Sequence, residues 1–168
     1  MYRTMLGALA PITLALSLAG CGGETAEPVD AANPDAPAGI SATEGRLNLP
    51  AVEGNPGALY FNVVNDSDRN RMIRAVSIMG AGSAIMHQMG TWNLEPSMEE
   101  VLQLNVPAGE TIAFEPGDYH VMAMDIDGSL EIGGETEATL TFVGGDKVSF
   151  PVTILGPGEM PAMDSPQN

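Results

Sequence analysis

Two runs of alternating side chains, TEATLTFV (residues 136–143) and KVSFPVTIL (residues 147–155), flank the tripeptide Gly144-Gly145-Asp146. Runs of four to eight residues with a period of two are typical of strands that bury one face. Two such runs joined by a short glycine turn predict a β-hairpin. This stretch therefore indicates an antiparallel β fold for the C-terminal part of the chain.

The residues before this hairpin repeat the same pattern. Short apolar or alternating runs are separated by turn signals built from Gly, Pro, Asn and Asp. The further predicted strands cover residues 58–65, 72–79, 83–89, 101–106, 111–115 and 120–126. About eight strands at this spacing predict an all-β antiparallel sandwich or barrel. No amphipathic helical stretch of comparable length is visible.

The N-terminal segment has the pattern of a targeting sequence. Residues 1–20 have one early positive charge and an apolar run that is too short for a transmembrane helix, so we interpret them as a signal peptide. Leu18-Ala19-Gly20-Cys21 resembles the bacterial lipobox, which implies cleavage before Cys21 and lipid attachment there. The alternative is an ordinary secretion signal that happens to end at a cysteine. The mature chain is expected in the periplasm, anchored by lipid to a membrane that the sequence does not specify.

The segments on either side of the domain are poor in apolar residues. Residues 21–43 are small, acidic and proline-containing, and they predict a flexible tether. The folded domain is expected to span residues 44–156, followed by a disordered tail over residues 157–168. That tail contains two methionines, Met160 and Met163.

The charge balance excludes several classes of function. Six Lys and Arg residues against 22 Asp and Glu residues give a formal net charge of −16. Nucleic-acid binding needs a basic face, so it is not expected. The single cysteine, Cys21, allows no internal disulfide and no cysteine-rich zinc site.

The two histidines of the chain each have a methionine two positions further on. His87 is followed by Met89, and His120 is followed by Met122 and then Met124. Residues i and i+2 share one face of a strand, so each pair would point the same way. Thioether sulfur and imidazole together suit Cu(I) better than zinc, magnesium or calcium. The alternative is a histidine satisfied within the fold, with methionine as a core filler.

A longer spacing pattern joins these pairs. His87 is followed by ten residues and Met98, then by 21 residues and His120, and one residue later by Met122. This pattern resembles the PCuAC family of periplasmic copper chaperones. The stretches 105–124, 58–65 and 139–154 resemble the corresponding parts of that family, and the resemblance covers about residues 44–155. Asp118 departs from it, because the family often has glycine there.

The resemblance implies a cupredoxin-like Greek-key β domain with a partly exposed Cu(I) site. Its ligands would be His87, Met98, His120 and Met122, with Met98 on a loop between strands. Met89 and Met124 are possible secondary ligands, although packing is the favoured interpretation. The family also implies a monomer that delivers copper to an acceptor, either cytochrome c oxidase subunit II at its Cu-A centre or a Sco-type thiol protein.

The sequence bears on three other classes of function: an electron carrier, an enzyme and a structural lipoprotein. A blue-copper electron carrier needs a cysteine thiolate beside two histidines, and Cys21 belongs to the lipobox. No nucleophile–base pair or phosphate-binding loop indicates an enzyme. A structural or binding lipoprotein, which buffers copper or binds no metal, is the main alternative. Trp92 is expected either to shield the site or to anchor its loop.

Overall fold

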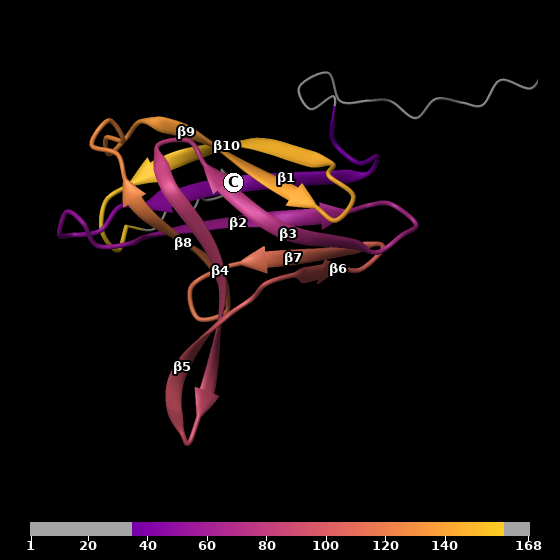
Figure 1. Cartoon of the computed structure of the whole chain (residues 1–168), viewed down its shortest axis with the longest axis horizontal. Helices are drawn as coiled ribbons and strands as arrows, with labels where there is room; N and C mark the ends of the chain where they lie inside the picture. Colours follow the sequence, from indigo (N-terminus) through magenta and orange to yellow (C-terminus); the bar gives the residue numbers. More distant parts are fainter. Residues whose placement is uncertain (1–34, 160–168) are drawn as a thin grey trace, which may run out of the picture.

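The computed structural model describes residues 35–159, and this part of the chain is all β (Figure 1). The predicted fold class is confirmed, with ten strands instead of about eight. Within residues 35–159 no helix is long and apolar enough to span a membrane. The strands are β1 Ile40–Asn48, β2 Gly57–Asn65, β3 Arg71–Ile78, β4 Ala81–Trp92, β5 Glu95–Glu100, β6 Leu104–Val106, β7 Glu110–Phe114, β8 Tyr119–Ile126, β9 Glu135–Phe142 and β10 Lys147–Leu155.

The first additional strand, β1, begins at Ile40, inside the segment predicted as a tether. Its alternation is broken by a register shift between Thr43 and Arg46 in its pairing with β2. Glu44 has a φ of 58° at this irregularity. A bulge of this kind moves the following side chains to the other face of the sheet. The alternation of apolar and polar residues is therefore interrupted, and the sequence does not show a regular strand pattern here. The predicted signal peptide and Cys21 lie outside the described residues.

The ten strands form one continuous sheet, in which β7 and β8 pair with successive parts of the same edge of β2. Strand β8 pairs with β4 and also with β2. The sheet was predicted to be antiparallel, but β1–β10 and β7–β8 pair in parallel. The first and last strands lie side by side, and a long intervening chain makes that parallel pairing possible. The order is β5-β4-β8-β7-β2-β1-β10-β9-β3-β6.

The predicted C-terminal hairpin is confirmed. Strands β9 and β10 pair with Lys147 opposite Thr141. Gly144 and Gly145 at the turn have φ angles of 111° and 103°. Residues with a side chain rarely adopt such angles, which explains the two glycines in sequence.

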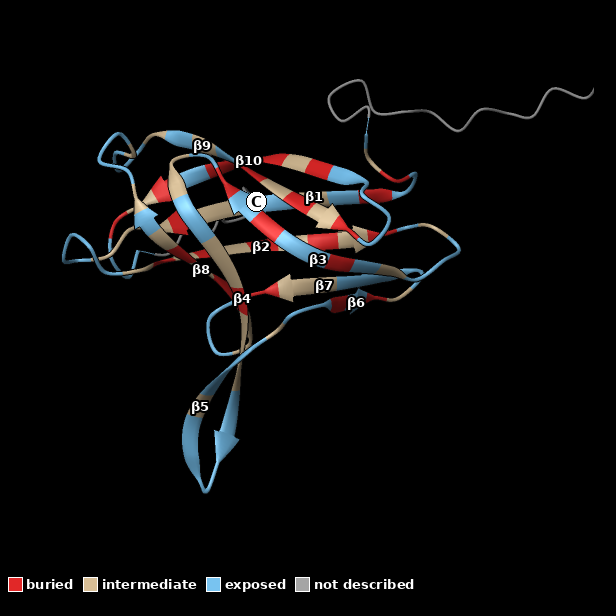
Figure 2. Cartoon of the chain, viewed as in Figure 1, coloured by how far each residue is buried: buried red, intermediate tan, exposed pale blue. Residues whose placement is uncertain are grey.

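The core lies between the strands of the main body (Figure 2). Phe61 stacks on Phe114 with ring centroids 4.2 Å apart, and Phe150 packs against Phe61 at 5.0 Å. Val121 and Ala123 of β8 point into this core and are fully buried. Their neighbours in sequence, including Met122 and Met124, therefore belong to the opposite face of β8.

A buried asparagine at the end of β2 forms hydrogen bonds to two other segments of the chain. Asn65 has no exposed surface. Its amide donates to the carbonyls of Arg69, Val106 and Pro107 at 2.8, 2.9 and 3.0 Å. Its Oδ1 accepts from the Ser67 hydroxyl at 2.6 Å. One side chain thus holds the β2–β3 turn against the end of β6.

The β4–β5 hairpin projects from this body (Figures 1 and 2). Within β5 only Ser97 is partly buried, and the other five residues are exposed. The hairpin is attached to the body through β4, which pairs with β8 from Ala81 to Gln88. The arrangement places the only two histidines of the sequence where the hairpin leaves the body.

Candidate metal centre

The two histidines lie directly opposite each other in the β4–β8 ladder. His87 and His120 are register partners, and their ring centroids are 5.9 Å apart. Antiparallel register partners point to the same face of a sheet. The pairing therefore brings together two imidazoles that are 33 positions apart in the sequence.

The His120 ring is held in one orientation by the main chain. This side chain is only 7 % exposed. Its Nδ1 lies 3.1 Å from the carbonyl oxygen of Asp118. A carbonyl can only accept, so Nδ1 carries the proton, and in the neutral ring Nε2 is left with a free lone pair.

The free nitrogen of His120 faces a thioether. Its Nε2 lies 3.2 Å from Sδ of Met98. When Nδ1 holds the only ring proton, both of these atoms are lone-pair donors. Two donors aimed at each other in this way are suited to binding a shared cation, and imidazole with thioether is the donor pair preferred by Cu(I).

Met98 lies on strand β5, not on a loop as predicted. It is the register partner of Met89 across the β4–β5 hairpin. The sequence EPSMEE (residues 95–100) is polar on both faces, so its strand character comes from backbone pairing at the edge of the sheet and leaves no apolar period. Met98 is 50 % exposed, which leaves the thioether open to solvent on one side.

His87 has a buried nitrogen that lacks a partner. Its Nδ1 is inaccessible to solvent and makes no hydrogen bond. The backbone of Ile85 nevertheless acts on this ring as a hydrogen-bond partner that raises its pKa, so the buried Nδ1 does not by itself indicate a bound ion.

The surroundings of His87 favour its neutral form. Burial lowers its pKa, and the nearby His120 lowers it further. Glu100, its register partner on β5, acts in the opposite direction, as does the backbone of Ile85. The lowered pKa favours the neutral ring, whose lone pair is free to coordinate a metal.

Met122 lies on the same face of β8 as His120. It is opposite Ile85 of β4 on one side and Ala58 of β2 on the other, and it is half-buried. Met124 lies one further step along this face, opposite Ser83. The structure thus brings His87, His120 and Met98 together, with Met122 in the adjacent row and Met124 beyond it.

Asp118 orients the site in a way that the sequence did not indicate. Besides accepting from His120, its carbonyl oxygen accepts from the Met89 N–H at 3.2 Å. Its carboxylate accepts from the Gln88 amide at 3.3 Å. The only sequence signal was the departure from glycine at this position, which does not reveal a role for the main-chain oxygen.

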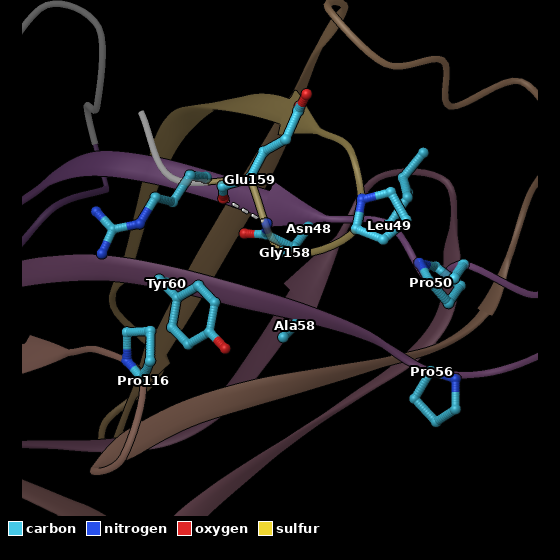
Figure 3. A pocket seen from close by; sticks show the side chains of 12 residues that line it. Asn48, Leu49, Pro50, Pro56, Ala58, Tyr60, Pro116, Gly158 and Glu159 are labelled. Atoms are coloured by element: carbon cyan, nitrogen blue, oxygen red, sulfur yellow. Dashed lines mark hydrogen bonds between the residues drawn. The ribbon is translucent and has the colours of Figure 1, made fainter. Parts of the chain in front are cut away.

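A pocket of about 440 Å³ lies beside this face but does not contain the histidines (Figure 3). Arg46 and Tyr60 line it, with the guanidinium 5.5 Å from the ring centroid. Asn48 donates to the carbonyl of Glu159 at 2.7 Å along its wall. Ala58, the register partner of Met122, also lines it, so the pocket and the His/Met face are neighbours.

The side chains on this face that could bind a metal ion carry nitrogen and sulfur donor atoms. Among residues 35–159 no group of three or more His, Cys, Asp or Glu side chains could hold a metal ion. The donors that the structure brings together are two imidazoles and a thioether, as described above.

Solved structures with the same fold are copper-binding domains. The copper-bound PCuAC domain from PmoF2 matches with a TM-score of 0.59 and 23 % identity, over 71 % of this chain and 94 % of that domain. The apo PCuAC domain from PmoF1 matches with a TM-score of 0.59 and 26 % identity, over 71 % and 95 %. The Cu(I) form of DR1885 from Deinococcus radiodurans matches with a TM-score of 0.52 and 22 % identity, over 69 % and 76 %.

These similarities confirm the predicted cupredoxin-like fold, which the chain shares with PCuAC domains. The family model described as "Putative lipoprotein LpqE-like" matches residues 40–154, so the chain belongs to the LpqE-like family. A relative named "Putative lipoprotein Lxx21020", from Leifsonia xyli subsp. xyli, is 30 % identical over 98 residues, which are 56 % of this chain. The match covers 59 % of that relative's length, less than two thirds of it.

Proposed function

We propose that this chain binds Cu(I) through His87, Met98, His120 and Met122 and carries it to an acceptor protein. The observation that supports this most directly is the 3.2 Å approach of His120 Nε2 to Met98 Sδ, with Nδ1 of the same ring held by Asp118. A second indication is the position of His87 directly opposite His120 in the β4–β8 ladder, with ring centroids 5.9 Å apart. Copper-bound domains of the same fold make Cu(I) the metal of choice.

The site has the properties needed for a carrier. Thioethers and neutral imidazoles hold Cu(I) without a thiol that an oxidising compartment could remove. The burial of His120 shields one side of the ion, whereas Met98 is half exposed and gives the ion a route outward. Met89, opposite Met98 on the hairpin, and Met124 are assigned to packing, with a secondary donor role as the alternative. Nothing in this arrangement requires catalysis.

The place of action follows from the N-terminal pattern and the family. Cys21 would carry lipid, and the domain would work in the periplasm at a membrane surface. The acceptors suggested by the resemblance are cytochrome c oxidase subunit II and a Sco-type thiol protein. The second candidate function is a structural or binding lipoprotein that buffers copper in the periplasm or binds no metal, and the family description names a lipoprotein without naming a metal.

An anaerobic Cu(I) titration against a competing chelator tests the first part of the proposal. The soluble chain from Gly22, which keeps every described residue, is compared with the double variant His120→Ala, Met122→Ala. One equivalent bound by the parent and lost in the variant supports the site. Equal binding by both proteins, or none by either, would contradict it and favour the lipoprotein with another ligand.

A further inference from the structure

The turn of the β4–β5 hairpin carries an unusual residue. Trp92 pairs with Glu95, so Asn93 and Leu94 form a two-residue turn, with φ angles of 53° and 67°. Positive φ at both central positions defines a type I′ turn, in which asparagine followed by glycine is strongly preferred. A leucine at the second position is strained, because its Cβ crowds the backbone in this conformation.

The same turn exposes two large apolar side chains. Leu94 is 96 % exposed and Trp92 is 71 % exposed, at the end of the projecting hairpin (Figure 2). Glycine would relieve the backbone strain, and a polar residue would relieve the unfavourable hydration of the side chain. A strained turn that also exposes two large apolar side chains is a reason to look for a contact site here.

The turn lies close to the proposed copper ligand Met98. The Met89–Met98 pair is three register steps from the Trp92–Glu95 pair that closes the hairpin. At about 3.4 Å per residue, that separation is roughly 10 Å along the strands. Because successive residue pairs alternate faces, Trp92 lies on the face of the hairpin opposite Met98. A partner that encloses the tip of the hairpin from both faces would therefore reach both Trp92 and the exposed side of Met98.

The charge of the hairpin indicates what kind of partner fits. Residues 81–103 contain Glu95, Glu99 and Glu100 and no Lys or Arg, within a chain of net charge −16. An anionic membrane surface would repel such a hairpin. A protein face that places Lys or Arg around an apolar pocket would complement both its charge and its apolar tip.

We infer that Trp92 and Leu94 are the docking surface for the copper acceptor, which receives them in an apolar pocket bordered by Lys or Arg. This inference rests on the proposed function for the identity of the partner. It assigns recognition to the hairpin tip and metal binding to the residues at its base. The two roles can therefore be separated by substitution.

The test compares the parent chain from Gly22 with the double variant Trp92→Ser, Leu94→Gly. Leu94→Gly relaxes the turn, so the variant keeps the fold. The matched control is Val143→Ser, which removes another exposed apolar side chain beside the β9–β10 turn. Stopped-flow experiments measure Cu(I) transfer to the soluble domain of cytochrome c oxidase subunit II, to a Sco-type thiol protein and to the small chelator bicinchoninate.

Transfer to at least one protein acceptor is expected to slow at least about tenfold in the double variant. Transfer to the chelator, which needs no docking, stays at the parental rate, and Val143→Ser behaves like the parent throughout. Added salt slows the parental transfer to the protein. Equal rates for parent and double variant with both acceptors would overturn the inference, and so would an equal slowing toward the chelator.

The other possible occupants of the tip are measured alongside. A parental dimer in sedimentation that the double variant loses, with unchanged transfer rates, would assign the tip to a second copy. Binding to phosphatidylcholine vesicles that only the parent shows, again with unchanged transfer, would assign it to lipid. Either result overturns the inference.

Failure of the proposed function is distinguishable from failure of the docking surface. A parent that binds no Cu(I) refutes the copper site alone. Binding of the metal-free chains to the same two acceptor domains by calorimetry then decides the docking question. Affinity at least about tenfold weaker in the double variant supports docking, and equal affinity or no parental binding overturns it.

Discussion

His87 and His120 face each other across the β4–β8 ladder, with ring centroids 5.9 Å apart. The two rings differ in how they are held. His120 is fixed through Nδ1 to the Asp118 carbonyl, whereas His87 has a buried Nδ1 with no partner. A cation bound between the His120 imidazole and the Met98 thioether would be held by lone pairs from β8 and β5 at the same time.

Removing the His120 ring should abolish tight Cu(I) binding. In His120→Ala the affinity for Cu(I) is expected to fall by more than about 100-fold, beyond the roughly 10–100-fold range of substitutions that only reorient a ligand. Chelator competition under anaerobic conditions measures it. The control is Met86→Leu, a swap of similar volume on the core face of β4, which should keep the parental affinity. Similar losses in both variants would mean that the fold, and not a ligand, was lost.

The two methionines that pair across the β4–β5 hairpin should differ in effect. Met98→Ala is expected to weaken Cu(I) binding about tenfold or more, because the Met98 thioether approaches His120 Nε2. Met89→Ala, at the register partner, should leave the affinity near the parental value. The same competition titration compares the two variants. A larger loss for Met89→Ala would mean that Met89 on β4 is the ligand and Met98 on β5 is not, which would contradict our account.

Asn65 should matter for stability and not for copper. Asn65→Ala leaves three carbonyls without their buried donor, and the free energy of unfolding should fall by roughly 2–4 kcal/mol. Urea denaturation measures this value. Asn62→Ala, three positions earlier, removes only an exposed bond to Glu44 and should cost less than about 0.5 kcal/mol. Equal effects of the two substitutions would contradict the role given to Asn65.

Copper should stabilise the fold through the native state. At a free Cu(I) concentration 100 times the dissociation constant, linkage adds about 2.7 kcal/mol. For a domain of this size the melting temperature should rise by roughly 10 °C. Anaerobic calorimetry with and without Cu(I) measures the shift, and His120→Ala should show little of it. An equal rise in that variant would place the bound copper elsewhere in the chain.

The sequence was most informative where one face of a strand is buried. The runs at residues 58–65, 136–143 and 147–155 correspond closely to β2, β9 and β10, because alternating burial leaves a period of two. Strand β5 was missed because an exposed edge strand has no apolar face to reveal it. Strand β1 was missed because the irregularity at Glu44 interrupts the alternation.

The candidate site was only partly readable from the sequence. The shared face of His120 and Met122 follows from strand periodicity, and the spacing to His87 and Met98 came with the family resemblance. The role of Asp118 is carried by its main-chain carbonyl, which any residue possesses. The unpartnered nitrogen of His87 depends on tertiary packing and leaves no trace in the sequence.

X-ray absorption spectroscopy of the Cu(I)-loaded chain from Gly22 tests the central claim most directly. The account predicts a copper shell that contains both imidazole nitrogen and thioether sulfur, with the sulfur contribution reduced in Met98→Ala. A shell of nitrogen and oxygen alone, or one that Met98→Ala leaves unchanged, would contradict the proposed His/Met site.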